Sequence, residues 1–83
     1  MRAVHTKRYQ ALLARLKAAR VACGLTQVQV ARALGRQQAY VSKCELGERR
    51  IDPIDLLDFS VLYRKPLEYF LADSKSRTLR RPR

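Results

Sequence analysis

Four polar residues suited to contact with nucleic-acid bases would lie along one side of a short helix: Gln37, Gln38, Ser42 and Lys43. A glutamine amide donates one hydrogen bond and accepts another, which matches the N6 and N7 edge of adenine. Gln38 is therefore the strongest candidate for reading a base. Lys43 could reach a guanine or a phosphate, and Ala39 could offer its methyl group to a thymine methyl. The alternative is that these are solvated positions on an exposed helix.

The first of two helices that would position these residues lies just before them. Thr26 and Gln29 form a capping box, in which the hydroxyl and the amide each satisfy a backbone N–H group of the other residue. Apolar residues follow at helical spacing at Val30, Ala31 and Leu34. Gly35 ends this helix, because glycine adopts the left-handed backbone conformation without steric strain.

The second helix covers about residues 37–46 and turns Val41 and Cys44 inward, three residues apart. Ala31 is small where the two helices must approach each other, and Gly47 follows the second helix as its stop. This is the helix-turn-helix arrangement, in which the second helix reads the major groove of DNA and the first crosses the backbone.

The net charge of +11, from 18 basic and 7 acidic residues, predicts a polyanionic partner, a nucleic acid rather than a membrane surface. The charge is unevenly distributed. Residues 1–24 hold six basic residues and no acid, residues 25–50 hold five basic and two acidic residues, and residues 74–83 hold five basic residues and no acid. Residues 51–73 hold two basic and five acidic residues. We therefore expect residues 51–73 to face away from the polyanion.

The rest of the pattern is also helical. Residues 9–23 predict a helix that ends at Gly24, residues 53–63 a helix capped by Asp52, and residues 66–71 a short helix that packs on the bundle or on a partner. Two adjacent apolar rows predict that the helix after Asp52 is largely buried, namely Ile54, Leu57 and Val61, and Leu56, Phe59 and Tyr63. Residues 1–8 would form a basic N-terminal arm, residues 9–73 the domain, and residues 74–83 a flexible basic tail.

The composition argues against several other classes of protein. Two cysteines and one histidine provide no metal-ligand spacing, so we expect no metal and no cofactor. Without a constellation of histidine, cysteine and carboxylate side chains, the chain is not expected to be an enzyme. No signal peptide or long apolar span is visible, so a cytoplasmic protein without membrane association is expected.

Three linked motifs, GLTQ, VARALG and YVSKCELGERR, resemble those of helix-turn-helix regulators of the phage repressor and Cro type, also called the Xre family. The resemblance covers residues 9–73. It implies an all-α, compact five-helix bundle of the lambda-repressor-like kind, encoded by a bacterium or a phage and associated with the nucleoid. Members of the family usually bind palindromic operators in double-stranded DNA as homodimers and regulate transcription.

The resemblance also implies roles for individual residues. The positions that read bases in the family are occupied by Gln37, Gln38, Ala39, Ser42 and Lys43. Phosphate contacts are expected from Thr26, Gln27, Arg36, Tyr40, Arg49 and Arg50. Arg20 and Glu45 match a salt bridge that ties the first helix to the recognition helix. The chain departs from the family pattern at Cys44, Leu46, Ser60 and in the pair Arg64–Lys65, which lacks the usual glycine.

We expect a sequence-specific DNA-binding transcriptional regulator that acts as a homodimer and as a repressor; the residues alone do not separate repression from activation or a dimer from a monomer. One alternative is an antitoxin or adaptor that binds a protein through residues 51–73 as well as DNA. Another is a non-specific nucleic-acid binder, which the charge alone would permit. The regulator and the non-specific binder differ in the effect of Gln38→Ala, which should alter base preference only if the protein is a sequence-specific regulator.

Overall fold

The helix boundaries follow local capping and stop residues. The computed structural model describes residues 6–71. Within these residues it contains five helices and no strand: α1 (Lys7–Ala22), α2 (Gln27–Leu34), α3 (Gln38–Leu46), α4 (Pro53–Tyr63) and α5 (Leu67–Leu71). The predicted all-α, five-helix architecture is confirmed. Residues 1–5 of the predicted arm and the predicted tail, 74–83, lie outside the described residues.

The predicted start of the first helix was wrong by two residues. α1 begins at Lys7 rather than at Tyr9, because the Thr6 hydroxyl accepts a hydrogen bond from the Tyr9 N–H group at 3.1 Å. A threonine in this position satisfies one of the donors that a helix start leaves unpaired. The prediction rested on the apolar repeat that follows Tyr9 and overlooked the cap, so residues 6–8 of the predicted arm belong to the start of α1.

The cap at the start of α2 and the stops of α2 and α3 agree with the prediction. The capping box at the start of α2 is present, with Gln29 N–H to Thr26 Oγ1 at 3.1 Å and Thr26 N–H to Gln29 Oε1 at 2.9 Å. Gly35 after α2 and Gly47 after α3 have φ values of 69° and 81°. These angles lie in the left-handed region that glycine adopts most readily. The two glycines therefore set the length of α2 and α3.

α4 ends in the same conformation without a glycine. Arg64 has φ 57°, and two bonds close the turn around it: Lys65 N–H donates to Ser60 O at 3.1 Å, and the Ser60 hydroxyl donates to Lys65 O at 2.5 Å. The serine and the absence of glycine both depart from the family pattern. The hydroxyl bond offsets part of the strain of a left-handed arginine.

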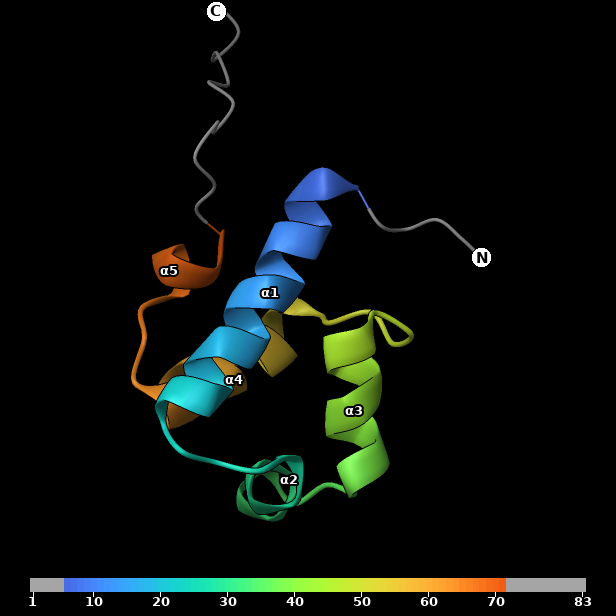
Figure 1. The fold of residues 1–83 in the computed structure, drawn as a ribbon, viewed down its shortest axis with the longest axis vertical. Helices are drawn as coiled ribbons and strands as arrows, with labels where there is room; N and C mark the ends of the chain where they lie inside the picture. Colours follow the sequence, from blue (N-terminus) through green and yellow to red (C-terminus); the bar gives the residue numbers. More distant parts are fainter. Residues whose placement is uncertain (1–5, 72–83) are drawn as a thin grey trace, which may run out of the picture.

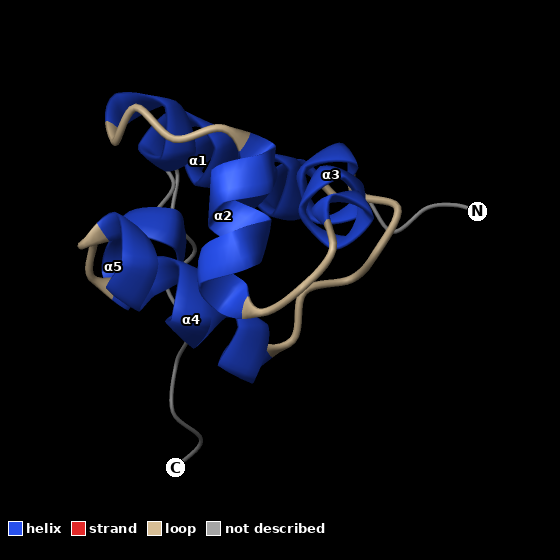
Figure 2. Cartoon of the chain, turned by 90° about the horizontal axis from the view of Figure 1, so that it is seen from below, coloured by secondary structure: helices blue, strands red, loops and turns tan. Residues whose placement is uncertain are grey.

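The core gathers one buried side of each of the five helices. Leu16 of α1, Val30 of α2, Val41 of α3, Phe59 of α4 and Phe70 of α5 all lie in one cluster of buried residues. α1 crosses the middle of this arrangement with α4 behind it, and α3 and α5 lie on opposite sides of the molecule in both views (Figures 1 and 2). Because Phe70 is buried against the bundle, α5 packs on this chain. α3 is left with one face exposed at the edge of the molecule.

The prediction for α4 needs a correction. The row Leu56, Phe59 and Tyr63 is buried, but Ile54, Leu57 and Val61 are 65%, 43% and 69% exposed. α4 packs on α1 and α5 and buries one stripe only. Periodicity cannot decide which of two neighbouring apolar rows faces the core, so the helix is half-exposed rather than largely buried. No helix among residues 6–71 has the length and apolar character needed to span a bilayer.

Replacing Tyr63 with phenylalanine should stabilise the fold. The Tyr63 hydroxyl is buried and has no hydrogen-bond partner among the described residues. Burial raises the pKa of Tyr63 above its ordinary value of 10.0, so the folded state favours the neutral phenol. Removing the unpaired hydroxyl should raise the free energy of unfolding by about 1 kcal/mol at pH 7 in urea titrations.

The same substitution should reduce the loss of stability in alkali. A raised pKa contributes stability that is present below the unfolded pKa and disappears as pH rises through the folded value. The advantage of Tyr63→Phe over the parent should therefore grow above about pH 10. A variant less stable than the parent at pH 7 would show that the hydroxyl has a partner.

Candidate nucleic-acid interface

α3 presents one polar face to solvent. Val41 and Cys44 are fully buried, which directs the opposite side of the helix outward. Of the predicted base-reading residues, four are exposed, namely Gln37, Gln38, Ala39 and Lys43, and Ser42 is half-buried. The structure therefore brings the five positions to one accessible helix, next to α2 (Figure 2).

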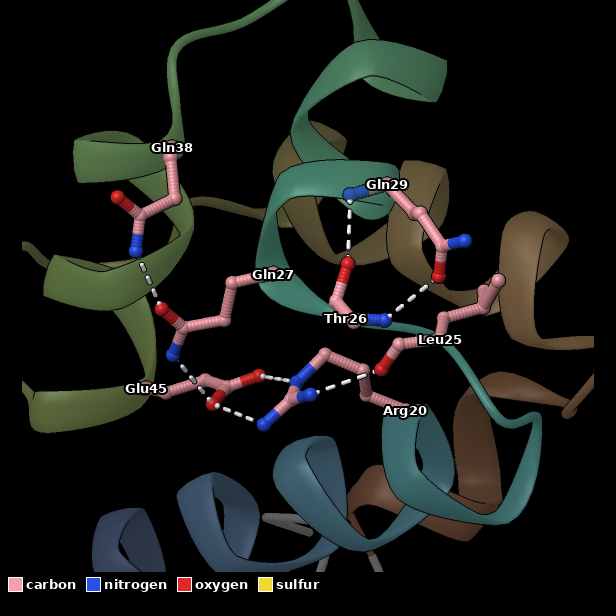
Figure 3. A network of polar contacts seen from close by, with 7 residues as sticks. All are labelled: Arg20, Leu25, Thr26, Gln27, Gln29, Gln38 and Glu45. Atoms are coloured by element: carbon pink, nitrogen blue, oxygen red, sulfur yellow. Dashed lines mark hydrogen bonds and ion pairs between the residues drawn. The ribbon is translucent and has the colours of Figure 1, made fainter.

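An ion pair ties this helix to α1. Arg20 Nε lies 2.6 Å from Glu45 Oε2, Arg20 Nη2 lies 3.2 Å from Oε1, and Arg20 Nη1 donates to Leu25 O at 2.8 Å (Figure 3). The Glu45 side chain is only 4% exposed. Hydrogen bonding to Glu45 raises the pKa of Arg20. The salt bridge implied by the resemblance is present, and it is two-pronged and largely buried.

Two glutamines extend this ion pair to the surface. Gln27 Nε2 donates to Glu45 Oε1 at 3.1 Å, and Gln38 Nε2 donates to Gln27 Oε1 at 2.8 Å (Figure 3). A carboxylate only accepts hydrogen bonds, so Gln27 must turn its NH2 group toward Glu45 and its oxygen toward Gln38. The donor-to-acceptor direction of these two hydrogen bonds therefore fixes the orientation of the Gln38 amide.

Gln27 was expected to contact a phosphate, and the structure places it between Glu45 and Gln38. One of its N–H groups serves Glu45, so the other remains for a further acceptor. The link to Gln38 was not predicted. The sequence does place both glutamines at the first position of their helices. Predicting that they meet, however, requires knowledge of the angle between α2 and α3.

A second cluster surrounds Tyr40. The Arg36 and Arg49 guanidinium carbons lie over its ring, 4.0 and 4.9 Å from the centroid, and the ring is parallel to Phe59 at 6.2 Å. Burial, and then hydrogen bonding to Asp55, raises the pKa of Tyr40. The phosphate contact of the Tyr40 hydroxyl stays a prediction, and the structure adds that the ring of Tyr40 supports two arginines.

Asp55 belongs to the segment 51–73, which we expected to face away from the polyanion, and it lies close to two arginines that flank α3. Its carboxylate lies 3.6 Å from Arg36 Nη2 and 3.9 Å from Arg49 Nη2, with the residue 6% exposed. The sequence showed only an acid in the first turn of α4. Its proximity to both arginines depends on how α4 packs behind the loops that flank α3.

An open hollow beside the start of α3 borders the Tyr40 cluster. It is lined by Gly35, Arg36, Gln37, Ala39, Tyr40, Lys43 and Arg49. Positively charged side chains and backbone at a helix start suit an anionic ligand.

A family model described as a helix-turn-helix domain matches residues 11–68 of the chain. The chain belongs to this family. Comparison with curated proteins and with solved structures gave no match. In a helix-turn-helix domain the second helix of the motif enters the major groove of DNA. Membership of this family indicates DNA binding, and α2 and α3 are the two helices of the motif.

Two further predicted contacts are placed differently within the domain. The Thr26 hydroxyl accepts a bond from Gln29 and thereby serves the start of α2. The Arg50 guanidinium lies over the ring of Tyr9 on α1, 4.9 Å from the centroid. The structure therefore joins Arg36 and Arg49 to one cluster beside α3 and does not bring Arg50 into it.

Proposed function

We propose that this helix-turn-helix domain is a sequence-specific transcriptional regulator of the phage repressor and Cro type. In this proposal it binds a palindromic operator as a homodimer in the cytoplasm, inserts α3 into the major groove and represses transcription by occupying the site. It acts by binding rather than by catalysis. Two copies related by a dyad would place their α3 helices in successive major grooves, about 34 Å apart.

The orientation of the Gln38 amide is the observation that supports base reading most directly. After donating one N–H to Gln27, Gln38 keeps one donor and its carbonyl oxygen. This pair matches adenine, which accepts at N7 and donates from N6. Guanine offers acceptors at both N7 and O6, so the Gln38 oxygen would face O6 without a proton between them. The network in Figure 3 therefore favours adenine over guanine at one position of each half-site.

The proposal is tested by selection from a library of random duplexes with the purified protein. We expect enrichment of an inverted repeat that holds an adenine at a fixed position of each half, and a mass of two protein chains per duplex by light scattering. Equal recovery of all duplexes would overturn the proposal and favour the non-specific binder, whose affinity comes from phosphate neutralisation alone.

A second candidate is an adaptor that binds a protein as well as DNA. The exposed apolar row Ile54, Leu57 and Val61 favours it, because such a row on a helix is available for a protein contact. Val61→Glu discriminates the two candidates in a light-scattering and DNA-binding assay. If the row serves only the operator-bound dimer, Val61→Glu should give a monomer that binds the selected operator weakly. An unchanged dimer and unchanged DNA binding would show that the row does not serve the dimer and leave it available to another protein.

Gln27→Ala should weaken base discrimination as well as affinity. Without the Gln27 oxygen, the Gln38 amide can rotate and present either edge, so the preference for adenine over guanine should fall about fivefold, or about 1 kcal/mol. The measurement is competition between the selected duplex and its guanine variant. Arg32→Ala, an exposed basic change on the same helix, is the control and should weaken both duplexes alike. A uniform loss for Gln27→Ala would mean that Gln27 only contacts a phosphate.

A further inference from the structure

The two arginines of the Tyr40 cluster are presented by the chain segments at the two ends of α3. Arg36 follows Gly35, and its N–H group donates to Ala31 O at 2.8 Å, which closes the end of α2. Arg49 follows Gly47 by two residues, and its N–H group donates to Lys43 O at 3.2 Å, which closes the end of α3. In both places a left-handed glycine and a backbone bond fix the position of the arginine main chain.

The side chains of these arginines converge on one carboxylate. Asp55 Oδ1 faces Arg36 and Asp55 Oδ2 faces Arg49, at 3.6 and 3.9 Å. These lengths exceed the 2.7–3.2 Å of a typical N–H···O hydrogen bond, so Asp55 attracts the guanidinium groups without occupying their donors. Each guanidinium has five donors, and both side chains are close to half exposed. The donors that remain can therefore reach an anion from solvent.

We propose that Asp55 is a positioning residue for a phosphate clamp formed by Arg36 and Arg49 on either end of the DNA-reading helix. The buried carboxylate of α4 holds two like-charged guanidinium groups over the Tyr40 ring, from which they bind backbone phosphates of the duplex. This inference rests on the proposed DNA-binding function and adds a residue that never touches DNA.

The charges of the cluster support a positioning role over simple neutralisation. Two arginines and one aspartate leave one net positive charge, and Lys43 lines the same hollow. Without Asp55, the two guanidinium groups would repel each other, and each flexible side chain would have to be ordered when DNA binds. The carboxylate orders both side chains before the duplex arrives.

The test uses a mixed-sequence duplex of about 20 base pairs and measures the binding constant over a series of salt concentrations. Each phosphate contact contributes about 0.9 to the slope of log K against log salt. Asp55→Asn, which removes the charge and keeps the shape, should lower the slope by up to about 2 and the affinity about tenfold. Equal or tighter binding with an unchanged slope would overturn the proposal. Equal binding would mean that Asp55 does not contribute, and tighter binding would mean that it only repels DNA.

Asp58→Asn is the matched control, because Asp58 is exposed on the same helix and undergoes the same change of charge. It should leave the slope unchanged. The positioning role is tested by measuring the effect of Asp55→Asn in a double variant that lacks both arginines, Arg36→Gln with Arg49→Gln. Adding Asp55→Asn there should have no further effect on DNA binding. A second loss of similar size would show that Asp55 acts through the fold rather than through the arginines.

A variant that retains all charges keeps the test decisive if Asp55→Asn does not fold. Arg36→Lys combined with Arg49→Lys preserves the charge but replaces each planar fork of five donors with a compact ammonium of three, which loses the geometry that lets one group face a carboxylate and a phosphate. This variant should bind about tenfold more weakly than the parent, and parental affinity would overturn the clamp. Because the probe has a mixed sequence, these results stand even if the library selection shows no base preference.

Discussion

Arg20→Ala is expected to lower the free energy of unfolding by about 3 kcal/mol, because removal of one partner leaves a buried charge uncompensated. The Glu45 side chain is almost completely enclosed, and its two charge-assisted hydrogen bonds come from the Arg20 guanidinium. For a domain of this size, a loss of about 3 kcal/mol corresponds to a fall in melting temperature of at least about 12 °C. Thermal and urea unfolding followed by circular dichroism measure both quantities.

Two variants make this result specific to the pair. Lys17→Ala changes an exposed basic residue of the same helix and should melt like the parent. Arg20→Met combined with Glu45→Leu removes both charges together and should recover most of the stability, since an apolar pair of similar volume avoids the unpaired carboxylate. If Arg20→Ala melts with the parent, the ion pair does not hold α1 to α3.

Gln38→Ala is expected to weaken binding to the selected operator by about 1–3 kcal/mol per half-site, or roughly fivefold to 150-fold. The methyl group of alanine offers neither the donor nor the acceptor that adenine requires. A repeated library selection with the variant should therefore lose its preference for adenine at one position of each half-site and keep the rest of the site. An unchanged selection profile would remove Gln38 from the readers.

Gln38→Glu separates hydrogen bonding from contact area at the same position. Glutamate has nearly the same size but only accepts hydrogen bonds, so it cannot donate to adenine N7 or to the Gln27 oxygen. We expect it to bind the selected site more weakly than Gln38→Ala and to lower the affinity for other duplexes as well. Better binding than the alanine variant at an adenine site would contradict the proposed geometry.

The sequence by itself determined the features that depend on residues within one helical turn of each other. The capping box of Thr26 and Gln29 and the stops at Gly35 and Gly47 are local, so their residue types and spacing suffice to predict them. With the buried pattern of Val41 and Cys44, these signals define α2, α3 and the outward face of α3. The start of α1 was missed because the cap at Thr6 lies before the apolar repeat on which the prediction of that helix rested.

The resemblance to the phage repressor family added the pair Arg20 and Glu45, which periodicity alone could not connect across 25 residues. Carrying over positions in this way supplies pairs that the family shares. It did not supply Asp55, because that residue was assigned only to the first turn of its helix. It also did not supply the bond between Gln27 and Gln38, because each glutamine was assigned a separate contact with DNA.

Only the tertiary structure decided which side chains of different helices meet. The packing of α4 determines that Leu56, Phe59 and Tyr63 enter the core while Ile54, Leu57 and Val61 do not, although both rows have helical spacing. The same packing places Asp55 between Arg36 and Arg49. Such contacts depend on the rotation of a helix about its axis and on its crossing angle with its neighbours. These are properties of the whole core and are not encoded in any short stretch of the chain.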